Sequence, residues 1–207
     1  MQIRKTLSRH TLILAKPLSF PALSPDHARE AGLGRQNGQW KKRESMQITP
    51  KSTQAHVRAA AASDAAAIAR LLAALARDIA GTCLADELIL NAVDAMIDDE
   101  RHRVFVAEEA PGSLTGVAVM VLSPDFWTGR QAAELRALAV THAARRRGVG
   151  SALLAAAADC ARAENCAYLH LLAEPKNTAA RRFFTAAGLQ TKPAAYFELD
   201  LRTRPPT

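Results

Sequence analysis

Three arginines and two glycines stand together where an apolar run gives way to an alanine-rich segment, in the order Arg145-Arg146-Arg147-Gly148-Val149-Gly150. The preceding run, residues 135–140, is typical of a strand, and the segment from Ser151 onward predicts a helix. Glycines let backbone N–H groups approach a ligand closely, and a helix N-terminus adds unpaired N–H donors and a partial positive charge. These residue types therefore predict a turn that binds a phosphate or pyrophosphate.

The segments that must position this turn alternate between strand and helix patterns from residue 56 onward. Expected strands are residues 56–60, 104–107, 114–122, 133–140, 167–172 and 196–201. Expected helices cover residues 64–79 with Ser63 as candidate N-cap, about Asp86 through Ile97, the segment from Ser151, and residues 178–187 ended by Gly188. Residues 123–131, with Phe126 and Trp127, are expected to form a loop. The alternation predicts an α/β sheet with helices on both faces.

Three motifs resemble one family. Arg145-x-x-Gly148-x-Gly150 after a strand resembles the Gln/Arg-x-x-Gly-x-Gly/Ala signature of the GCN5-related N-acetyltransferase (GNAT) family. The segment Asn177-Thr178-Ala179-Ala180-Arg181-Arg182-Phe183-Phe184, followed by Gly188-Leu189, resembles that family's Asn-x-x-Ala-x-x-Phe-Tyr-x-x-x-Gly-Phe motif. Val57-Arg58 followed by Ser63-Asp64 resembles its first strand and helix. The resemblance covers residues 56–203; the alternative is a generic α/β domain with a glycine turn.

The resemblance implies the GNAT fold, which is a mixed, mostly antiparallel sheet of six to seven strands, splayed at its centre and covered by helices on both faces. It also implies acetyl-CoA as co-substrate. The pantetheine arm would pair with the backbone of the fourth strand, where one N–H group polarises the thioester carbonyl, and the pyrophosphate would lie on the glycine turn. The expected cofactor-binding residues are Leu138, Ala139, Val140, Arg145, Arg146, Arg147, Gly148, Val149, Gly150, Ser151 and Asn177.

For proton transfer the resemblance points to Glu134, whose offset of eleven residues from Arg145 matches the general base of histone-acetylating members. A carboxylate there could accept the proton directly or through water, bind a cationic substrate, or cap a strand end. Asp125 and His142 are weaker candidates for the same task. Phe184 replaces the tyrosine that protonates the CoA thiolate in many members. Water, Tyr196 or another group must therefore protonate the thiolate in this chain.

The implied function is direct transfer of an acetyl group from acetyl-CoA to an amine, without an acyl-enzyme. The segment Phe126-Trp127-Thr128-Gly129 resembles small-amine acetyltransferases of the aminophosphonate and aminoglycoside-like kind, which implies a small-molecule amine as the acceptor. Trp127 would either stack on the substrate or close the sheet edge. A peptide or protein amine is the alternative acceptor. A non-catalytic acetyl-CoA-binding module is the alternative function, because the tyrosine is missing. Dimers are frequent in the family, so a homodimer is compatible with the resemblance.

The net charge is confined to one end of the chain. The 207 residues hold 27 Lys/Arg and 20 Asp/Glu; residues 1–55 hold ten and three of these, which leaves seventeen of each for residues 56–207. The balanced part therefore shows no nucleic-acid footprint. The basic extension favours a mostly disordered segment. It could be an inert tail upstream of a natural start at Met46, an organelle-targeting segment, or an arm that binds polyanions.

Composition bounds the remaining expectations. Cys83, Cys160 and Cys166 are odd in number and lack the spacing of a zinc site, which favours a reduced, cytoplasmic protein without a metal. No apolar run approaches the ~18 residues that a membrane span needs. The expected organisation is a basic extension over residues 1–55, an acetyltransferase domain over residues 56–203, and a tail over residues 204–207.

Overall fold

The computed structural model describes residues 35–36, 39–40, 48, 55–80 and 85–193. The chain divides into two units, Met1–Ser45 and Met46–Thr207. Within the first unit, β1 (Arg35–Gln36) pairs antiparallel with β2 (Gln39–Trp40). Apart from this ladder and residues 48 and 55, the basic extension lies outside the described residues, as do the expected strand at 196–201 and the tail.

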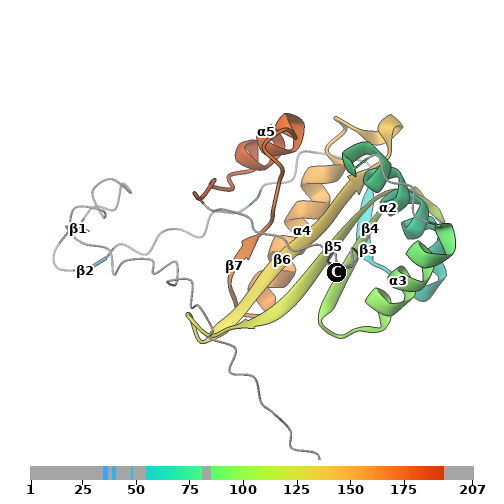
Figure 1. Cartoon of the computed structure of the whole chain (residues 1–207). Coiled ribbons are helices and arrows are strands. Elements are labelled where there is room, and N and C mark those ends of the chain that lie inside the picture. Colours follow the sequence, from blue (N-terminus) through green and yellow to red (C-terminus); the bar gives the residue numbers. More distant parts are fainter. Residues whose placement is uncertain (1–34, 37–38, 41–47, 49–54, 81–84, 194–207) are drawn as a thin grey trace, which may run out of the picture. The chain divides into compact units, whose positions relative to one another are not determined.

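The second unit is built on a five-stranded sheet in the order β3-β4-β5-β6-β7 (Figure 1). Its strands are β3 (His56–Ala59), β4 (His102–Ala110), β5 (Ser113–Asp125), β6 (Arg130–Val140) and β7 (Cys166–His170). The pairs β3–β4, β4–β5 and β5–β6 are antiparallel, and the pair β6–β7 is parallel. The mixed, mostly antiparallel sheet predicted from the sequence is confirmed, with five strands in the described part.

Helices cover both faces of this sheet, as predicted. The 3₁₀ turn η1 (Ala62–Asp64), α2 (Ala65–Ala80) and α3 (Asp86–Asp98) follow β3, whereas the 3₁₀ turn η2 (His142–Ala144) and α4 (Val149–Ala163) follow β6. The last described helix is α5 (Thr178–Ala186), and Gly188 beyond it has a φ of 93°. A glycine is favoured there because L side chains rarely adopt this left-handed conformation.

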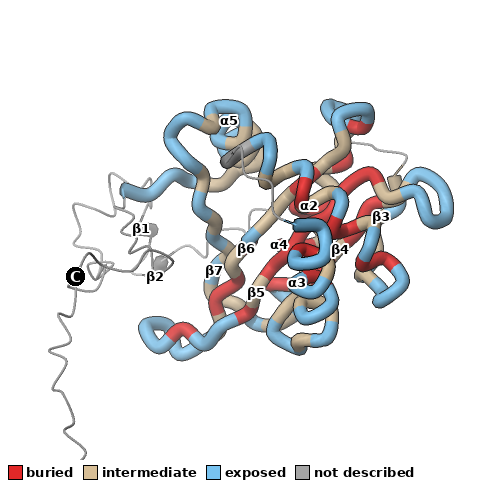
Figure 2. The backbone as a smooth tube through the Cα atoms, turned by 45° about the vertical axis from the view of Figure 1, so that its right-hand side comes forward, coloured by how far each residue is buried: buried red, intermediate tan, exposed pale blue. Residues whose placement is uncertain are grey.

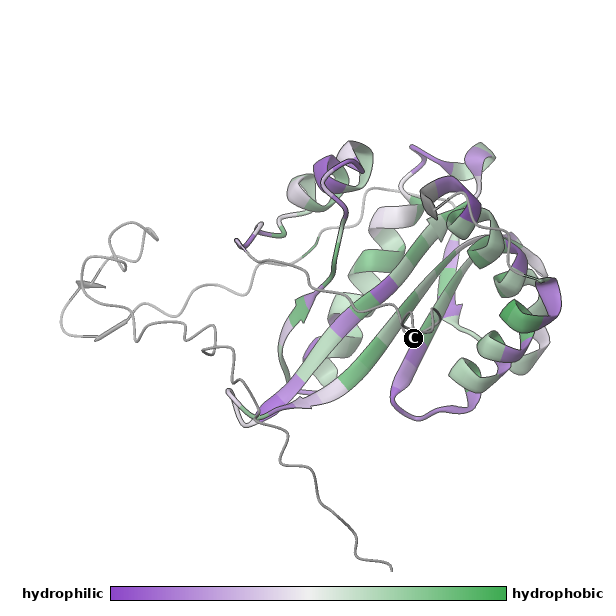
Figure 3. Ribbon diagram, viewed as in Figure 1, coloured by the Kyte–Doolittle hydropathy of each residue, from purple (hydrophilic) through white to green (hydrophobic). Residues whose placement is uncertain are grey.

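Side chains alternate between the two faces of the sheet along each strand, so the hydrophobic core has one part on each face. On one face Ala118, Met120 and Leu122 of β5 pack with Leu153 and Leu154 of α4. On the other face the intervening Val117 and Val119 pack with residues of α2 and α3, among them Ile68, Ile89 and Val93. The buried and apolar positions therefore concentrate along the central strands and the inner sides of the helices (Figures 2 and 3).

A partly buried charge cluster joins β3, β4 and the turn that leads into α2. Arg58 of β3 donates to both Asp64 oxygens at 2.7 and 3.0 Å, and to Glu108 of β4 at 3.0 and 3.2 Å. These hydrogen bonds hold the pKa of both carboxyls below the ordinary range. Asp64 also accepts from the Ala61 N–H at 2.8 Å. Asp64, and not the expected Ser63, thus caps the turn that leads into α2.

The expected loop over residues 123–131 is wrong. Both strands continue through it, with Ser123, Pro124 and Asp125 paired to Ala132, Gln131 and Arg130. The polar and proline-containing sequence is typical of a loop, but the ladder extends because each of these residues has a partner on the neighbouring strand. Only residues 126–129 form the connection.

We predict that Gly116 sets how closely α4 approaches the sheet. A Cβ at this position would lie 2.9 Å from Leu153 Cδ1 and 3.0 Å from the Ala139 carbonyl oxygen. Gly116→Ala should lower the free energy of unfolding by about 1–3 kcal/mol through overpacking. Ser113→Ala, at an exposed position of the same strand, is the control and should change it by less than about 0.5 kcal/mol. Chemical denaturation measures both, and equal stability of the two variants would contradict the prediction.

Candidate functional site

The site begins with an irregularity in β6. Val119 pairs with Ala137 but Met120 pairs with Leu135, so Arg136 has no partner on β5 and forms a bulge. The bulge reverses which face each later side chain occupies. Ala133 and Leu135 belong to the core under α4, whereas Ala137 and Ala139 lie toward α2 and α3.

The pairing between β6 and β7 ends early. Its last pair is Glu134 with His170, although β6 continues to Val140 along β5. Beyond His170 the chain separates from β6 and continues toward α5 (Figure 1). The strand predicted over residues 167–172 is therefore two residues shorter at this end. Residues 135–140 of β6 consequently present one edge without a strand partner in the described part of the chain.

A cavity of about 270 Å³ lies where the two strands separate. Its walls come from β6, from the segment after β7, from α2 and from α5. The lining residues are Leu75, Leu135, Arg136, Ala137, Leu138, Leu171, Leu172, Ala173, Glu174, Asn177, Ala180 and Phe184. Three residues expected from the sequence meet here, namely Leu138, Asn177 and Phe184. The walls are mainly apolar, which suits the arm of a thioester-carrying ligand better than a polar group.

The arginine–glycine turn lies beyond the end of β6. Gly148 adopts a φ of 85° and Arg146 a φ of 67°, and α4 begins at Val149, two residues before the predicted start. The first helical hydrogen bond runs from the Ala152 N–H to the Gly148 carbonyl at 3.0 Å. The N–H groups of Val149, Gly150 and Ser151 precede it and form the donor end of the helix.

Two of the three arginines are held by carboxylates. Arg145 donates to Asp78 of α2 at 2.9 Å and to the Val140 carbonyl at 3.2 Å. Arg147 lies 2.9 Å from a carboxylate oxygen of Glu109 in β4. These contacts connect the turn to α2, to β4 and to the end of β6. The positive φ of Arg146, which a non-glycine residue rarely adopts, is part of the same turn.

Helix α5 packs over the start of α4. The Asn177 side chain accepts from the Ala180 N–H at 3.1 Å, so the asparagine caps α5 and also lines the cavity. Phe183 lies against Gly150, where a Cβ would be 3.5 Å from the ring. Phe184 contacts Phe183 edge to face, with ring centroids 5.0 Å apart. Because Phe184 lines the cavity, this wall carries no hydroxyl at that position.

Glu134 lies at the last pair of the β6–β7 ladder, with its carboxylate 3.4 Å from Nε of Arg136. The other two candidates lie elsewhere. Asp125 is buried at the end of β5 and accepts from the Thr128 hydroxyl at 2.7 Å. His142 belongs to η2, beyond the opposite end of β6. The described residues contain no group of three or more metal-ligating side chains, and no described helix is long and apolar enough to cross a membrane.

Sequence patterns do not single out Tyr168 and His170, yet both lie beside Glu134. Their rings meet edge to face with centroids 5.6 Å apart. Burial raises the pKa of the Tyr168 phenol, and the charge of Asp125 and its hydrogen bond to Tyr168 raise it further. The alternation of Tyr168, His170 and Leu172 with apolar residues indicates in the sequence that these three side chains share one face of a strand. Which residues of β6 they lie beside is visible only in the structure.

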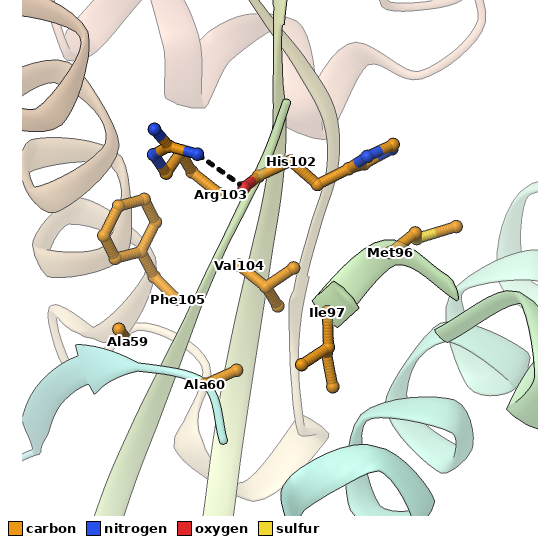
Figure 4. Close-up of a pocket in the computed structure, with 8 residues that line it drawn as sticks. All are labelled: Ala59, Ala60, Met96, Ile97, His102, Arg103, Val104 and Phe105. Atoms are coloured by element: carbon orange, nitrogen blue, oxygen red, sulfur yellow. Dashed lines mark hydrogen bonds between the residues drawn. The ribbon is translucent and has the colours of Figure 1, made fainter. Parts of the chain in front are cut away.

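A second cavity, of about 150 Å³, lies between β3, β4 and the end of α3 (Figure 4). Its arginine has other partners, whereas Nδ1 of His102 is buried and has no hydrogen-bond partner among the described residues. Arg103 donates to Glu164 at 2.6 Å and to the His102 carbonyl at 3.1 Å. Nδ1 of His102 lies 3.2 Å from an Asp99 oxygen. The larger cavity is therefore the candidate site.

The acetyltransferase (GNAT) family matches residues 67–189, which is more than half of the chain. The chain belongs to the GNAT acetyltransferase family. Its members are acyltransferases that generally use acetyl-CoA and act on amines. No curated protein matches the chain.

Solved structures of this family share the fold. A possible acetyltransferase from Clostridium difficile 630 is 19% identical, with a TM-score of 0.65 over 71% of this chain and 97% of that chain. The ribosomal-protein-alanine N-acetyltransferase of Brucella melitensis biovar Abortus 2308 is 20% identical, with a TM-score of 0.59 over 70% and 99%. An aminoglycoside acetyltransferase from an uncultured soil metagenomic sample, in complex with sisomicin, is 17% identical, with a TM-score of 0.60 over 71% and 96%. At these identities the likeness concerns the fold.

An ordinary tyrosine has a pKa of about 10. We predict that the Tyr168 phenol ionises at a higher pH than this. Phenolate absorbance measured during an alkaline titration tests this, and the difference between wild type and Tyr168→Phe isolates Tyr168 from Tyr196. Asp125→Asn should lower the Tyr168 pKa, because a negative neighbour that disfavours the phenolate is removed. A Tyr168 titration at or below the ordinary value would show that the phenol is neither buried nor close to Asp125.

Proposed function

We propose that this GNAT protein transfers the acetyl group of acetyl-CoA directly to the amine of a small molecule. The observation that carries the proposal is the early end of the β6–β7 ladder. Among the described residues it leaves one edge of residues 135–140 without a strand partner, beside a cavity of about 270 Å³, and this strand leads into the donor end of α4. An edge of free N–H and C=O groups suits the amides of a pantetheine arm, and the helix end suits a pyrophosphate.

The residues proposed to hold acetyl-CoA follow from that arrangement. Backbone groups of Leu138, Ala139 and Val140 would bond the pantetheine arm, with one N–H in this trio polarising the thioester carbonyl. Asn177, which lines the cavity, would bond the same arm. The pyrophosphate would be bound by backbone N–H groups of residues 146–151. Arg145 and Arg147 already contact Asp78 and Glu109, so we propose that they fix the turn and add charge to it.

The chemistry requires a neutral amine and a stabilised thiolate. A primary amine is mostly protonated at neutral pH, so a nearby base contributes to the rate. We propose that Glu134, in the last pair before β6 and β7 separate, assists in removing this proton. The thiolate leaves beside Phe184, which cannot donate a proton, so water, Tyr196 or another group would protonate it. A CoA thiol has an ordinary thiol pKa and is a tolerable leaving group without a dedicated acid.

The acceptor is proposed to be a small molecule on the strength of the β5–β6 connection. Phe126 and Trp127 are 77% and 57% exposed, with ring centroids 4.2 Å apart. Trp127 therefore does not close the sheet edge within the described structure. Two exposed aromatic rings can hold an apolar or cationic small molecule by stacking. The metagenomic aminoglycoside acetyltransferase shows that this fold accommodates such acceptors in another protein.

The experiment that tests the function is release of free thiol from acetyl-CoA in the presence of an amine panel. The panel contains polyamines, aminosugars, aminophosphonates and peptides with free N-termini. Thiol release with a small amine supports the proposal. Release with peptides alone would assign a peptide acceptor, and acetyl-CoA binding without release to any amine would indicate a non-catalytic binding module.

Gly150 offers a sharp test of where acetyl-CoA binds. A Cβ at Gly150 would make ordinary contacts, 3.5 Å from Phe183 and 3.7 Å from Val140, so Gly150→Ala should fold and bind acetyl-CoA. Gly150→Glu introduces a negative charge at the proposed pyrophosphate site and should abolish measurable affinity in calorimetry. Unchanged affinity of a folded Gly150→Glu variant would remove the turn from the binding site.

Glu134→Gln keeps the size of the side chain and removes its charge. General acid–base help is worth about 10²–10⁴-fold, so turnover at neutral pH should fall by about 10²-fold while acetyl-CoA affinity stays the same. High pH should restore part of the rate, because the free amine then forms without help. Glu100→Gln, at an exposed position between α3 and β4, is the matched control. Wild-type rates for Glu134→Gln across the pH range would make Glu134 a bystander.

A further inference from the structure

His170 lies where the sheet opens. It is paired with Glu134 in the last rung of the β6–β7 ladder, so the two backbones are about 4.8 Å apart. Leu169 and Leu171 pack into the core under α4, as do Ala133 and Leu135 beside Glu134. Because side chains alternate along a strand, His170 and Glu134 both project from the opposite face. The imidazole and the carboxylate therefore lie on the same face of neighbouring strands, in the last pair before the strands separate and next to the cavity rather than in its lining.

The imidazole is held from one side only. Tyr168 contacts it edge to face, with ring centroids 5.6 Å apart, and Asp125 lies close enough to help raise the pKa of the Tyr168 phenol. Within the described part of the chain, no hydrogen bond or ion pair engages the two nitrogens of His170, and its side chain is exposed. The ring is thus oriented by packing while its nitrogens remain free to exchange a proton.

We infer that His170 is a second catalytic residue, which accepts the proton of the substrate ammonium while Glu134 stabilises the resulting imidazolium. This inference rests on the proposed function. The ammonium N–H bond breaks and its proton passes to an imidazole nitrogen. The freed lone pair forms the N–C bond, the C–S bond breaks, and sulfur takes that electron pair. Of the two protons that nitrogen loses, the first leaves through His170 to solvent and the second ends on the thiolate, which gives the amide and the CoA thiol.

Proton affinity explains why an imidazole is the better acceptor. An ordinary amine has a pKa near 10, an imidazole near 6.5 and a glutamate near 4.3, so the transfer to imidazole is less uphill. A base also works best when its pKa lies close to the operating pH. The pair therefore divides the work, with the histidine taking the proton and the glutamate supplying the negative charge.

Other charged or titratable groups along this face bear on the pH dependence. They are Tyr168 on β7, Glu134 and Arg136 on β6, Asp125 at the end of β5, and Glu174, which lines the cavity. The guanidinium of Arg136 contacts Glu134 at 3.4 Å and partly offsets its charge. Neither Tyr168 nor Arg136 ionises near neutral pH, so a rise in rate between about pH 6 and 7 would report the imidazole.

The test compares pH profiles of kcat/KM for the full chain, with an amine identified by thiol release. Wild type should rise through the range in which an imidazole loses its proton. His170→Gln should lower kcat/KM at neutral pH by about 10²-fold and shift the rise toward the alkaline range of the amine itself. Melting temperature and acetyl-CoA affinity should match those of wild type. His56→Gln is the matched control, because the His56 side chain is 73% exposed on β3, at the other end of the sheet.

Two further variants separate catalysis from structure. Added imidazole should restore part of the rate to His170→Ala, which a lost packing contact would not allow. The double variant Glu134→Gln/His170→Gln should be less impaired than the product of the two single effects, since the residues act as a pair. If wild type turns over and His170→Gln keeps its rate and pH profile, the inference is wrong and the proposed function stands. If wild type releases no thiol with any amine, the proposed function is wrong and the inference falls with it.

Discussion

The separation of β6 from β7 is the constraint on which the candidate site depends. Two strands that stayed paired along their whole length would leave neither a free edge nor a cavity between them. Pairing continues to Glu134 and His170 and then stops, because the chain after His170 turns toward α5 while β6 remains bound to β5. Each wall of the opening therefore has its own support. One wall is a central strand of the sheet, and the other is held by the packing of α5 on the start of α4.

The bulge at Arg136 contributes to the same opening in a different way. An uninterrupted strand would place Ala137 and Ala139 on the same face as Leu135. With the extra residue, these two alanines pack toward α2 and α3, while Leu138 and Val140 pack toward α4. Beyond the bulge, the small side chains of β6 therefore face α2 and α3, and the larger ones face α4. Close approach of α4 depends instead on Gly116 of the neighbouring strand, whose missing side chain makes room for Val149 and Leu153.

Local patterns in the sequence predicted most of the fold correctly. The helices, the β4–β5 hairpin, the strand before the glycine turn and the cap at Gly188 are confirmed, because each rests on a period of apolar residues or on a residue with a special backbone preference. Motifs placed the glycine turn before α4 and the asparagine before α5, and of the residues that line the cavity they named Leu138, Asn177 and Phe184. What sequence patterns missed depends on pairing between distant segments. The extension of β5 and β6 through Pro124, the bulge at Arg136 and the register of His170 against Glu134 all follow from which residue faces which, and no local pattern encodes that.

The ion pairs of the arginine-rich turn change its electrostatic character. Three consecutive arginines suggest a strongly cationic loop that draws anions from a distance. Asp78 and Glu109 balance two of those charges at 2.9 Å, so the long-range field of the turn is close to that of a single cation. Attraction of this kind steers diffusing ligands weakly, and salt alters it little. A polyanion arriving at this turn would therefore be captured at short range by directed N–H groups, and its rate of association would vary little with ionic strength.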